Sequence, residues 1–332
     1  MFRVGLNPYG LAYAVGLQGA GTPRENPLPV GLDGFMHVAQ EVGARCLEIH
    51  GPWLEGQSGP TLDRIREECA SHGMTPIVST GLKHQPGETL RNAVTHARAV
   101  GATVVRLGLT PVLEGSRAAW GARWHAMVAH ARSTLGREAP RASDAGITIA
   151  IEDHQDFGSE ELLAMAEAAG PGVGIVFDTG NPFAVGEDPV AFAQRAAHRI
   201  RHVHLKDYRA QFTDEGYRLV RCAVGDGAVP FWDLARVLSS HHEELTASIE
   251  PGALEARHIR LFTPKWWNGY PHRDASELGT AIGRLRATRI ADGEPYQTPW
   301  ESEAPPDEIV EYEMAQVRRS IDNMRAFDQG AR

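Results

Sequence analysis

The segment Ile147-Thr148-Ile149-Ala150-Ile151-Glu152 decides the fold, because it is a short apolar run that ends in a residue able to bind a metal ion. Three further runs in the second half of the chain follow the same plan, and their last residues are Asp178, His204 and Glu250. Short runs rich in Ile and Val are typical of buried parallel strands. A loop or helical segment separates each run from the next, which is the βαβ pattern. The runs therefore predict parallel strands of one sheet.

The polar residues that end these runs are expected to lie together. The carboxyl ends of parallel strands meet at one face of a sheet, so the side chains of Glu152, Asp178, His204 and Glu250 should converge there. A single carboxylate after a strand is most often a helix cap or a loop residue. Four successive strands that end in Glu, Asp, His and Glu are difficult to explain as helix caps and loop residues. Carboxylates and an imidazole form an oxygen-rich site for a divalent ion. The pattern predicts one such ion held by all four residues.

The same alternation of strand and helix extends toward the N-terminus. Strand-like segments occupy about residues 2–6, 45–50, 75–79 and 103–107, and the third of them ends near Lys83 and His84. Eight strands with helices between them, in about 250 residues, are typical of a (β/α)8 TIM barrel, whose active sites lie at the C-terminal face of the strands. A doubly wound open sheet is the alternative, and the lack of a G-x-G-x-x-G motif after the first strand disfavours it.

The chain continues beyond the eighth strand. We expect residues 1–255 to form the TIM barrel and residues 256–332 to form a barrel-closing helix and a C-terminal extension. The last helix carries an apolar stripe that needs an apolar cover. Its members are Val310, Met314, Val317, Ile321 and Met324. The barrel's own helices are the expected cover, and a partner subunit is the alternative.

Composition narrows the class of protein. The net charge of −9 and the pI near 5.9 disfavour a nucleic-acid partner, which requires a positive surface. The three cysteines are scattered and suggest a reducing interior. The sequence has neither an apolar run of membrane-spanning length nor a signal-peptide pattern. We therefore expect a soluble cytoplasmic protein that binds a small-molecule sugar or keto-sugar but neither nucleic acid nor membrane. A homo-oligomer or a small partner subunit stays open.

The expected ion suggests chemistry on a sugar. A divalent ion can bind a hydroxyl and a carbonyl oxygen of a sugar, polarise the carbonyl and stabilise an enediolate. A base then removes the proton from the carbon next to the carbonyl. Glu152 and Glu250 are candidates for this base. His154 is a further candidate, because residues two apart in a strand point to the same side. It could equally be a loop residue bonded to the backbone.

Other polar and aromatic residues near the strand ends are candidates for contacting the substrate. They are His50, Trp53, Asn181, Lys206, Arg221 and Trp266. Lys206 could bind a sugar oxygen or a phosphate, or pair with Asp207. Asn181 could bind substrate or belong to a turn, and a turn at Gly225-Asp226-Gly227 could carry Arg221 over the pocket. Trp53 and Trp266 could stack on a sugar ring or serve as core packing.

Four short motifs carry a resemblance to a known family. They are Ile151-Glu152-Asp153-His154, Phe177-Asp178-Thr179-Gly180-Asn181-Pro182, His202-Val203-His204-Leu205-Lys206-Asp207 and Ile249-Glu250-Pro251. In this order they resemble the xylose isomerase-like TIM barrel superfamily of sugar isomerases and epimerases, over about residues 2–255. The resemblance implies one divalent ion, Mn²⁺ in first place, with Mg²⁺, Co²⁺ or Zn²⁺ as alternatives. It implies metal ligands at Glu152, Asp178, His204 and Glu250, and proton transfer by Glu152 and Glu250, as in the epimerases of the family.

The sequence also departs from the family pattern. The epimerases and the related apurinic endonucleases usually carry a His where this chain has Asn181, and the Asp-x-His pair of the endonucleases is missing from residues 220–225. A trinuclear nuclease is therefore not expected. Glu152 with His154 resembles the branches that act on oxidised sugars, among them the catalytic subunits of C-glycoside deglycosidases and the 3-oxo-sugar-acid decarboxylases.

The sequence leads to three candidate functions. The first is a sugar isomerase or epimerase that acts through a metal-stabilised enediolate. The alternative is a lyase on an oxidised sugar, by 3-oxo-glucoside C-deglycosylation or 3-oxo-acid decarboxylation. The last is a non-catalytic sugar-binding barrel.

Overall fold

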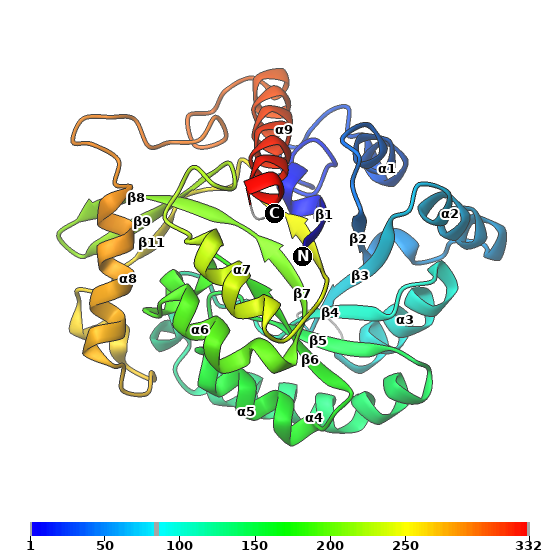
Figure 1. Ribbon diagram of the computed structural model, residues 1–332, viewed down its shortest axis with the longest axis horizontal. Helices are drawn as coiled ribbons and strands as arrows, with labels where there is room; N and C mark the ends of the chain where they lie inside the picture. Colours follow the sequence, from blue (N-terminus) through cyan, green and yellow to red (C-terminus); the bar gives the residue numbers. More distant parts are fainter. Residues whose placement is uncertain (1, 83–85, 331–332) are drawn as a thin grey trace.

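A closed barrel of parallel strands forms the centre of the computed structural model, which describes residues 2–82 and 86–330 (Figure 1). Lys83 and His84, expected near the end of the third strand, lie outside the described residues. In chain order the barrel strands are β1 (Phe2–Leu6), β2 (Cys46–His50), β3 (Thr75–Gly81), β4 (Val104–Gly108), β5 (Thr148–Glu152), β6 (Val173–Asp178), β7 (Ile200–Leu205) and β10 (Leu245–Ile249). Each strand pairs in parallel with its neighbours and β10 pairs with β1, so the predicted TIM barrel is confirmed and the open sheet is excluded.

Helices surround the barrel. They are α1 (Gly31–Glu41), α2 (Gly59–Ser71), α3 (Pro86–Val100), α4 (Ala122–Asp144), α5 (Ser159–Ala169), α6 (Pro189–Ala196), α7 (Phe231–Ser239), α8 (Ala275–Ala287) and α9 (Pro306–Gly330). Short 3₁₀ helices occur in the connections, at Pro8–Leu11, Gly51–Leu54, Arg117–Trp120, Asn181–Val185, Ala197–Arg199 and Pro264–Trp267. Among the described residues, no helix is long and apolar enough to cross a membrane.

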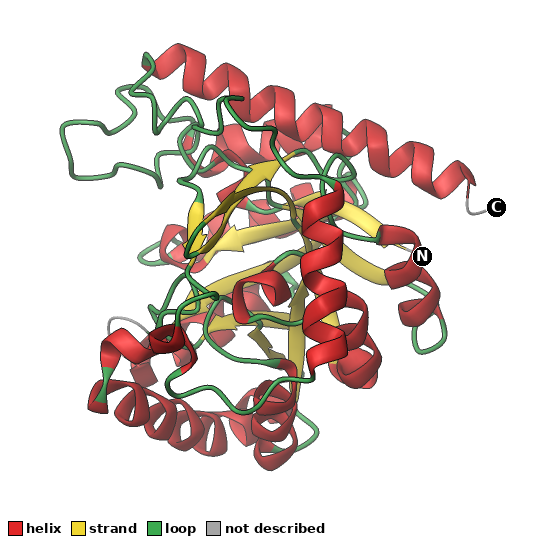
Figure 2. Ribbon diagram, turned by 90° about the vertical axis from the view of Figure 1, so that its left-hand side faces the viewer, coloured by secondary structure: helices red, strands yellow, loops and turns green. Residues whose placement is uncertain are grey.

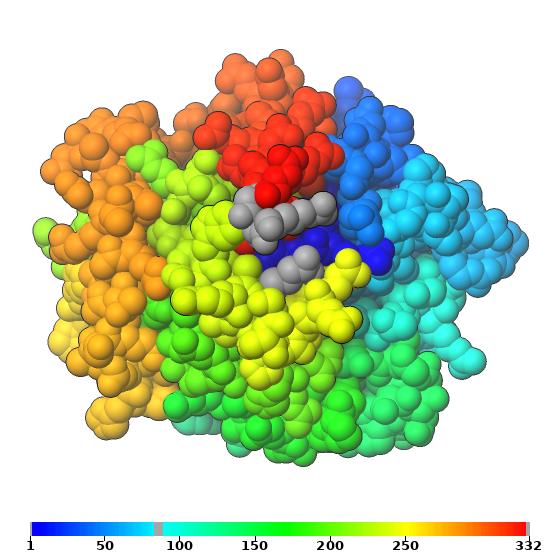
Figure 3. All heavy atoms as spheres, in the orientation of Figure 1, coloured from blue at the N-terminus to red at the C-terminus, as the bar shows by residue number. Residues whose placement is uncertain are grey.

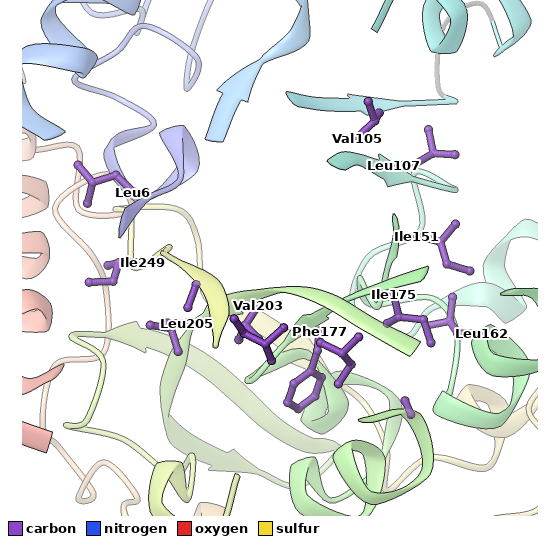
Figure 4. Packing of buried hydrophobic residues seen from close by; sticks show 14 of the residues in the cluster. Leu6, Val105, Leu107, Ile151, Leu162, Ile175, Phe177, Val203, Leu205 and Ile249 are labelled. Atoms are coloured by element: carbon purple, nitrogen blue, oxygen red, sulfur yellow. The ribbon is translucent and has the colours of Figure 1, made fainter. Parts of the chain in front are cut away.

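Buried apolar side chains fill the space between the strands and this ring of helices. Phe177 on β6 stacks on Phe192 of α6 with a distance of 5.1 Å between the ring centroids. Figure 4 shows Phe177 beside Val203 of the next strand, in a row of branched and aromatic residues that continues to Ile175 and Leu162. Alternate residues of the strands therefore anchor the helices, which leaves the remaining positions free to point into the barrel.

The last helix completes the ring. Helix α9 lies along one side of the barrel (Figure 2), and its atoms fill the surface between α7 and the N-terminal segment (Figure 3). Phe327 of α9 packs on Trp232 of α7 with a centroid distance of 4.2 Å, and Arg325 donates to the carbonyl oxygen of Val42 after α1. Val317, Ile321 and Met324 are buried. The barrel's own elements therefore cover the apolar stripe.

A small antiparallel sheet was not predicted from the sequence. Strands β8 (Asp207–Thr213), β9 (Gly216–Cys222) and β11 (Arg257–Ile259) form it, with β9 in the middle. The sheet begins directly after β7, and the hairpin of β8 and β9 accounts for the long interval between His204 and Glu250. It also places Arg221 of β9 close to the strand ends of the barrel, where its Nη1 atom lies 3.6 Å from Oε1 of Glu250.

Candidate metal centre and substrate pocket

The four residues predicted to share a metal ion do come together. Glu152 and Asp178 end strands β5 and β6, His204 lies near the end of β7, and Glu250 directly follows β10. The strand register pairs Asp178 with His204, and the amide of Glu250 donates to the carbonyl oxygen of Leu205, so the ends lie at one level. All four side chains are buried, and their ligating atoms lie within 4.8 Å of one another.

The imidazole of His204 has its Nδ1 atom toward two of these carboxylates, Glu152 and Glu250. Its Nε2 atom lies 2.7 Å from Oε2 of Glu48. Its Nδ1 atom lies 2.9 Å from Glu152 and 3.2 Å from Glu250, yet it makes no hydrogen bond to any of residues 2–82 and 86–330. A buried polar atom without a partner costs about 1–3 kcal/mol. A cation bound between Nδ1 and the carboxylates removes that cost, so these residues fit a divalent ion.

Three cationic side chains surround the carboxylates. Arg106 of β4 contacts Oε2 of Glu152. Lys206 is buried between Asp178 and Glu250, and its Nζ atom lies 2.7 Å from Oε1 of Glu250. Arg221 lies farther from Glu250 and donates to the carbonyl oxygen of Pro251 at 3.2 Å. These charges offset the repulsion between carboxylates that lie close together in a buried site.

The surroundings shift the acidity of the carboxylates in opposite directions. Burial favours the neutral form of Glu152, but Arg106 outweighs it and holds the pKa of Glu152 well below the ordinary range. Burial likewise opposes ionisation of Glu250, and Lys206 together with His204 lowers its pKa. For Asp178, burial dominates over Lys206 and raises the pKa. The two glutamates are therefore anionic and suited to bind a cation.

A pocket of about 340 Å³ opens beside Glu152. Its polar lining includes four ring or guanidinium side chains and several hydroxyls, from Tyr9, His50, Arg106, His154, Ser79, Thr80 and Thr110. Burial, followed by the neighbouring Arg106, lowers the pKa of His50 from 6.5 to about 4. Glu152 belongs both to the pocket lining and to the metal-ligating group, so a bound molecule would lie next to the ion.

Three of the predicted substrate and proton-transfer residues reach this pocket. Glu152, His50 and His154 line it. Trp53 packs behind His50 at a centroid distance of 5.6 Å and against Phe35 at 6.0 Å. Trp53 is thus a support for His50 rather than part of the lining formed by the described residues.

The remaining predicted residues take other places. Asn181 is buried and donates from Nδ2 to the carbonyl oxygen of Asp153 at 3.0 Å. Trp266 is buried as well, donates to the carbonyl oxygen of Glu114 and stacks on Tyr270 at 4.5 Å. Of the two roles considered for each, Asn181 fits the turn and Trp266 fits core packing.

Lys206 does not pair with Asp207, which was one of the two interpretations of this lysine. Asp207 instead accepts hydrogen bonds from the backbone amides of Tyr208, Gly225, Gly227 and Val229 and closes the turn after β9. Lys206 is committed to Asp178 and Glu250, so its contact with substrate stays a prediction.

Sequence reasoning missed Arg106 and Glu48, which both lie at the site. Each is a single charged residue inside an apolar strand, in Val104-Val105-Arg106-Leu107 and in Cys46-Leu47-Glu48-Ile49. A charge at such a position must find a partner inside the barrel, because burying an unpaired charge is very costly. That isolated charge was the available signal.

Fold and site together define a TIM-barrel protein with a carboxylate and histidine cluster at the C-terminal strand ends. Residues 36–258, about two thirds of the chain, match the family described as xylose isomerase-like TIM barrel. The chain belongs to this family, whose members include enzymes, and the resemblance inferred from the four motifs is confirmed.

Individual relatives are more distant. An inosose dehydratase of Clostridium beijerinckii is 30% identical over 152 residues, which are 41% of this chain and 49% of that protein. The chain thus spans about half the length of the Clostridium inosose dehydratases it matches. A 3-oxo-isoapionate decarboxylase of Pectobacterium atrosepticum is 22% identical over 228 residues, or 68% of this chain and 78% of that protein.

The solved structures support the fold. The structure of a xylose isomerase domain protein from Planctomyces limnophilus has a TM-score of 0.52 at 18% identity, covering 79% of this chain and 95% of that one. At this identity the likeness concerns the barrel alone.

Proposed function

We propose that this chain is a divalent-metal-dependent enzyme that acts on a sugar or keto-sugar by moving the proton next to its carbonyl group. The observation that carries the proposal is the Nδ1 atom of His204, which faces Glu152 and Glu250 at the edge of the pocket. The buried position of all four ligating residues supports a specific cation rather than a loose surface site.

Glu152, Asp178, His204 and Glu250 would hold the ion, with Mn²⁺ the first expectation and Mg²⁺, Co²⁺ or Zn²⁺ as alternatives. Such an ion supplies Lewis-acid polarisation of a substrate carbonyl oxygen. The pocket volume of about 340 Å³ suits a small molecule, since ligand pockets commonly measure about 300–1,000 Å³. Its hydroxyl-bearing walls suit a polyhydroxylated substrate.

The proton transfer falls to His154 in this proposal. Both ligand glutamates already have cationic neighbours, Arg106 at Glu152 and Lys206 at Glu250. His154 lines the same pocket as Glu152, close enough for its charge to act on that carboxylate. It would accept the proton from the carbon next to the carbonyl at a ring nitrogen. Return of that proton to the former carbonyl carbon, together with transfer of the hydroxyl proton from one oxygen to the other, gives an isomer. Its transfer to a departing hydroxyl group gives water and a dehydrated product.

A lyase is the second candidate. The dehydratase and decarboxylase relatives favour it, and so does His154 together with the turn position of Asn181, where the epimerases usually carry a His. The substrate would then be an oxidised sugar or cyclitol, through elimination, 3-oxo-acid decarboxylation or 3-oxo-glucoside C-deglycosylation. Isomerisation and lyase chemistry share an enediolate or enolate intermediate, which forms by loss of a proton in isomerisation and elimination and by release of CO₂ in decarboxylation.

The test detects that shared intermediate, because it takes up deuterium next to the carbonyl when it is protonated in D₂O. The protein is stripped with a chelator, reloaded separately with Mn²⁺, Mg²⁺, Co²⁺ or Zn²⁺, and incubated in D₂O with ketohexoses, a keto-inositol, a 3-oxo-glucoside and a 3-oxo acid. We expect metal-dependent incorporation of deuterium next to the carbonyl for at least one substrate, followed by NMR. The product then distinguishes an isomer from an elimination or decarboxylation product. Stoichiometric metal without exchange or turnover on any substrate would favour the non-catalytic sugar-binding barrel.

A further inference from the structure

Glu48 lies directly behind His204, on the side away from the other ligating residues. Its side chain is fully buried on β2, a strand that takes no part in the metal-ligating group of four. Within the described residues, Glu48 pairs with two histidines. Its Oε2 atom lies 2.7 Å from Nε2 of His204 and 3.4 Å from Nε2 of His202. A carboxylate at this depth therefore depends on His204 for its main hydrogen bond.

This hydrogen bond determines which nitrogen of His204 carries the proton. An ionised carboxylate only accepts hydrogen bonds, so Nε2 of His204 must donate. In the neutral imidazole the lone pair then belongs to Nδ1, which faces Glu152 and Glu250. The Nδ2 atom of Asn7 lies 3.3 Å from the same Nε2 atom, a longer contact than that of Glu48. Glu48 thus fixes both the tautomer and the ring orientation.

The neighbouring histidine, His202, has shorter contacts to two hydroxyl groups than to Glu48. His202 has its Nδ1 atom 2.7 Å from the hydroxyl of Thr246 and its Nε2 atom 2.9 Å from the hydroxyl of Ser248. Glu48, His202 and His204 form a second group that could hold an ion. The direct hydrogen-bond distance between Glu48 and His204 argues against an ion between them.

We propose that Glu48 is a positioning residue that presents Nδ1 of His204 to a single metal ion. This inference rests on the proposed function, since it concerns the affinity of the same site. Outer carboxylates of this kind orient metal-binding histidines in other proteins, and their loss typically weakens metal binding about 10–100-fold.

The test compares metal dissociation constants measured by chelator competition, with the absorption spectrum of the Co²⁺-loaded protein as a second readout. Glu48→Gln keeps the shape of the side chain but removes its charge and allows its amide to donate to Nε2, which favours the wrong tautomer. We expect the dissociation constant to rise about 10–100-fold and the Co²⁺ spectrum to change. Thr246→Val is the matched control, because it removes a partly buried polar contact to the neighbouring His202 without touching Glu48 or His204.

The outcomes separate this inference from the proposed function. If the wild-type protein binds no divalent ion, both fall. If it binds one ion and Glu48→Gln binds with unchanged affinity and spectrum, only the role of Glu48 is overturned. Two ions per chain would also overturn it. Should the glutamine variant not fold, Glu48→Asp provides the same test, because it withdraws the carboxylate from Nε2 while keeping its charge.

Discussion

Arg106 of β4 contacts Oε2 of Glu152 on the neighbouring strand β5, and both side chains are largely removed from solvent, with exposures of 13% and 1%. The pair connects the pocket, which both residues line, to the metal-ligating group, which includes Glu152. Arg106 therefore orients a proposed metal ligand while its guanidinium lines the space available to substrate. Its second contact, 3.4 Å from Nη1 to the carbonyl oxygen of Thr80, joins the pair to β3.

Replacing Arg106 should destabilise the metal-free protein. Arg106→Gln leaves the buried carboxylate of Glu152 without its main counter-charge, and breaking a buried ion pair typically costs about 3–5 kcal/mol. We expect the free energy of unfolding in guanidinium chloride, measured with chelator present, to fall by that amount. Arg66→Gln is the control, because Arg66 pairs with Asp63 at 2.7 Å on the surface and such pairs contribute about 0–1 kcal/mol. Equal losses in the two variants would contradict a buried pair.

Removal of a metal ligand should abolish specific metal binding. His204→Ala or Glu152→Gln takes one donor from a group whose ligating atoms lie within 4.8 Å of one another. We expect both variants to lose stoichiometric metal, the metal-induced rise in melting temperature and all activity, while the metal-free proteins keep the wild-type circular dichroism spectrum. The rise in melting temperature reports binding to the native state. Full occupancy in the double variant would refute the assignment.

His154 should affect turnover without affecting metal content. A general base typically contributes about 10²–10⁴-fold, so His154→Ala should lower kcat by about 100-fold or more. His154→Gln can still hydrogen-bond substrate but does not take up a proton at useful pH. The measurement is kcat on the substrate identified by deuterium exchange, with metal content determined on the same samples. If the glutamine variant keeps near wild-type kcat, His154 positions substrate and the pair Glu152 and Glu250 carries the proton.

The barrel and the four converging residues were predictable because each depends on local pattern. A run such as Val173–Asp178 is buried along its whole length, and its final polar residue marks the strand end. Parallel pairing then places Asp178 opposite His204 without further information. Strand order in a barrel follows chain order, so the neighbours of each strand were implied by the count.

The parts that could not be predicted depend on contacts between distant segments. Glu48 and His204 are 156 residues apart and lie on strands that are not neighbours in the barrel, so no local pattern joins them. Trp266 depends in the same way on the carbonyl oxygen of Glu114. Strand β8 begins with Asp207 and has polar residues at several positions, so its sequence resembles that of a loop. Its antiparallel pairing with β9, which the sequence does not indicate, makes it a strand.

His50 should make stability depend on acidity. Burial, followed by Arg106, lowers its pKa from 6.5 to about 4, so the folded state prefers the neutral imidazole. Between these values the unfolded chain binds more protons, and the contribution of His50 to stability is therefore present above about pH 6.5 and lost as the pH falls toward 4. For a fully buried ring, this pKa difference corresponds to about 3 kcal/mol of folding stability. Because the ring of His50 is partly exposed, we expect a contribution of about 1–2 kcal/mol.

The measurement is the change in the free energy of unfolding between about pH 7 and about pH 4.5, with chelator present. His50→Gln has no imidazole to protonate, so it should lose about 1–2 kcal/mol less than the wild-type protein on acidification. All other titrating groups are common to both proteins and cancel in the difference. His37→Gln serves as the control, because His37 is 70% exposed on α1 and its ring is not enclosed by the barrel. A loss in His50→Gln as large as in the wild-type protein would mean that His50 is not the group that resists protonation in the pocket.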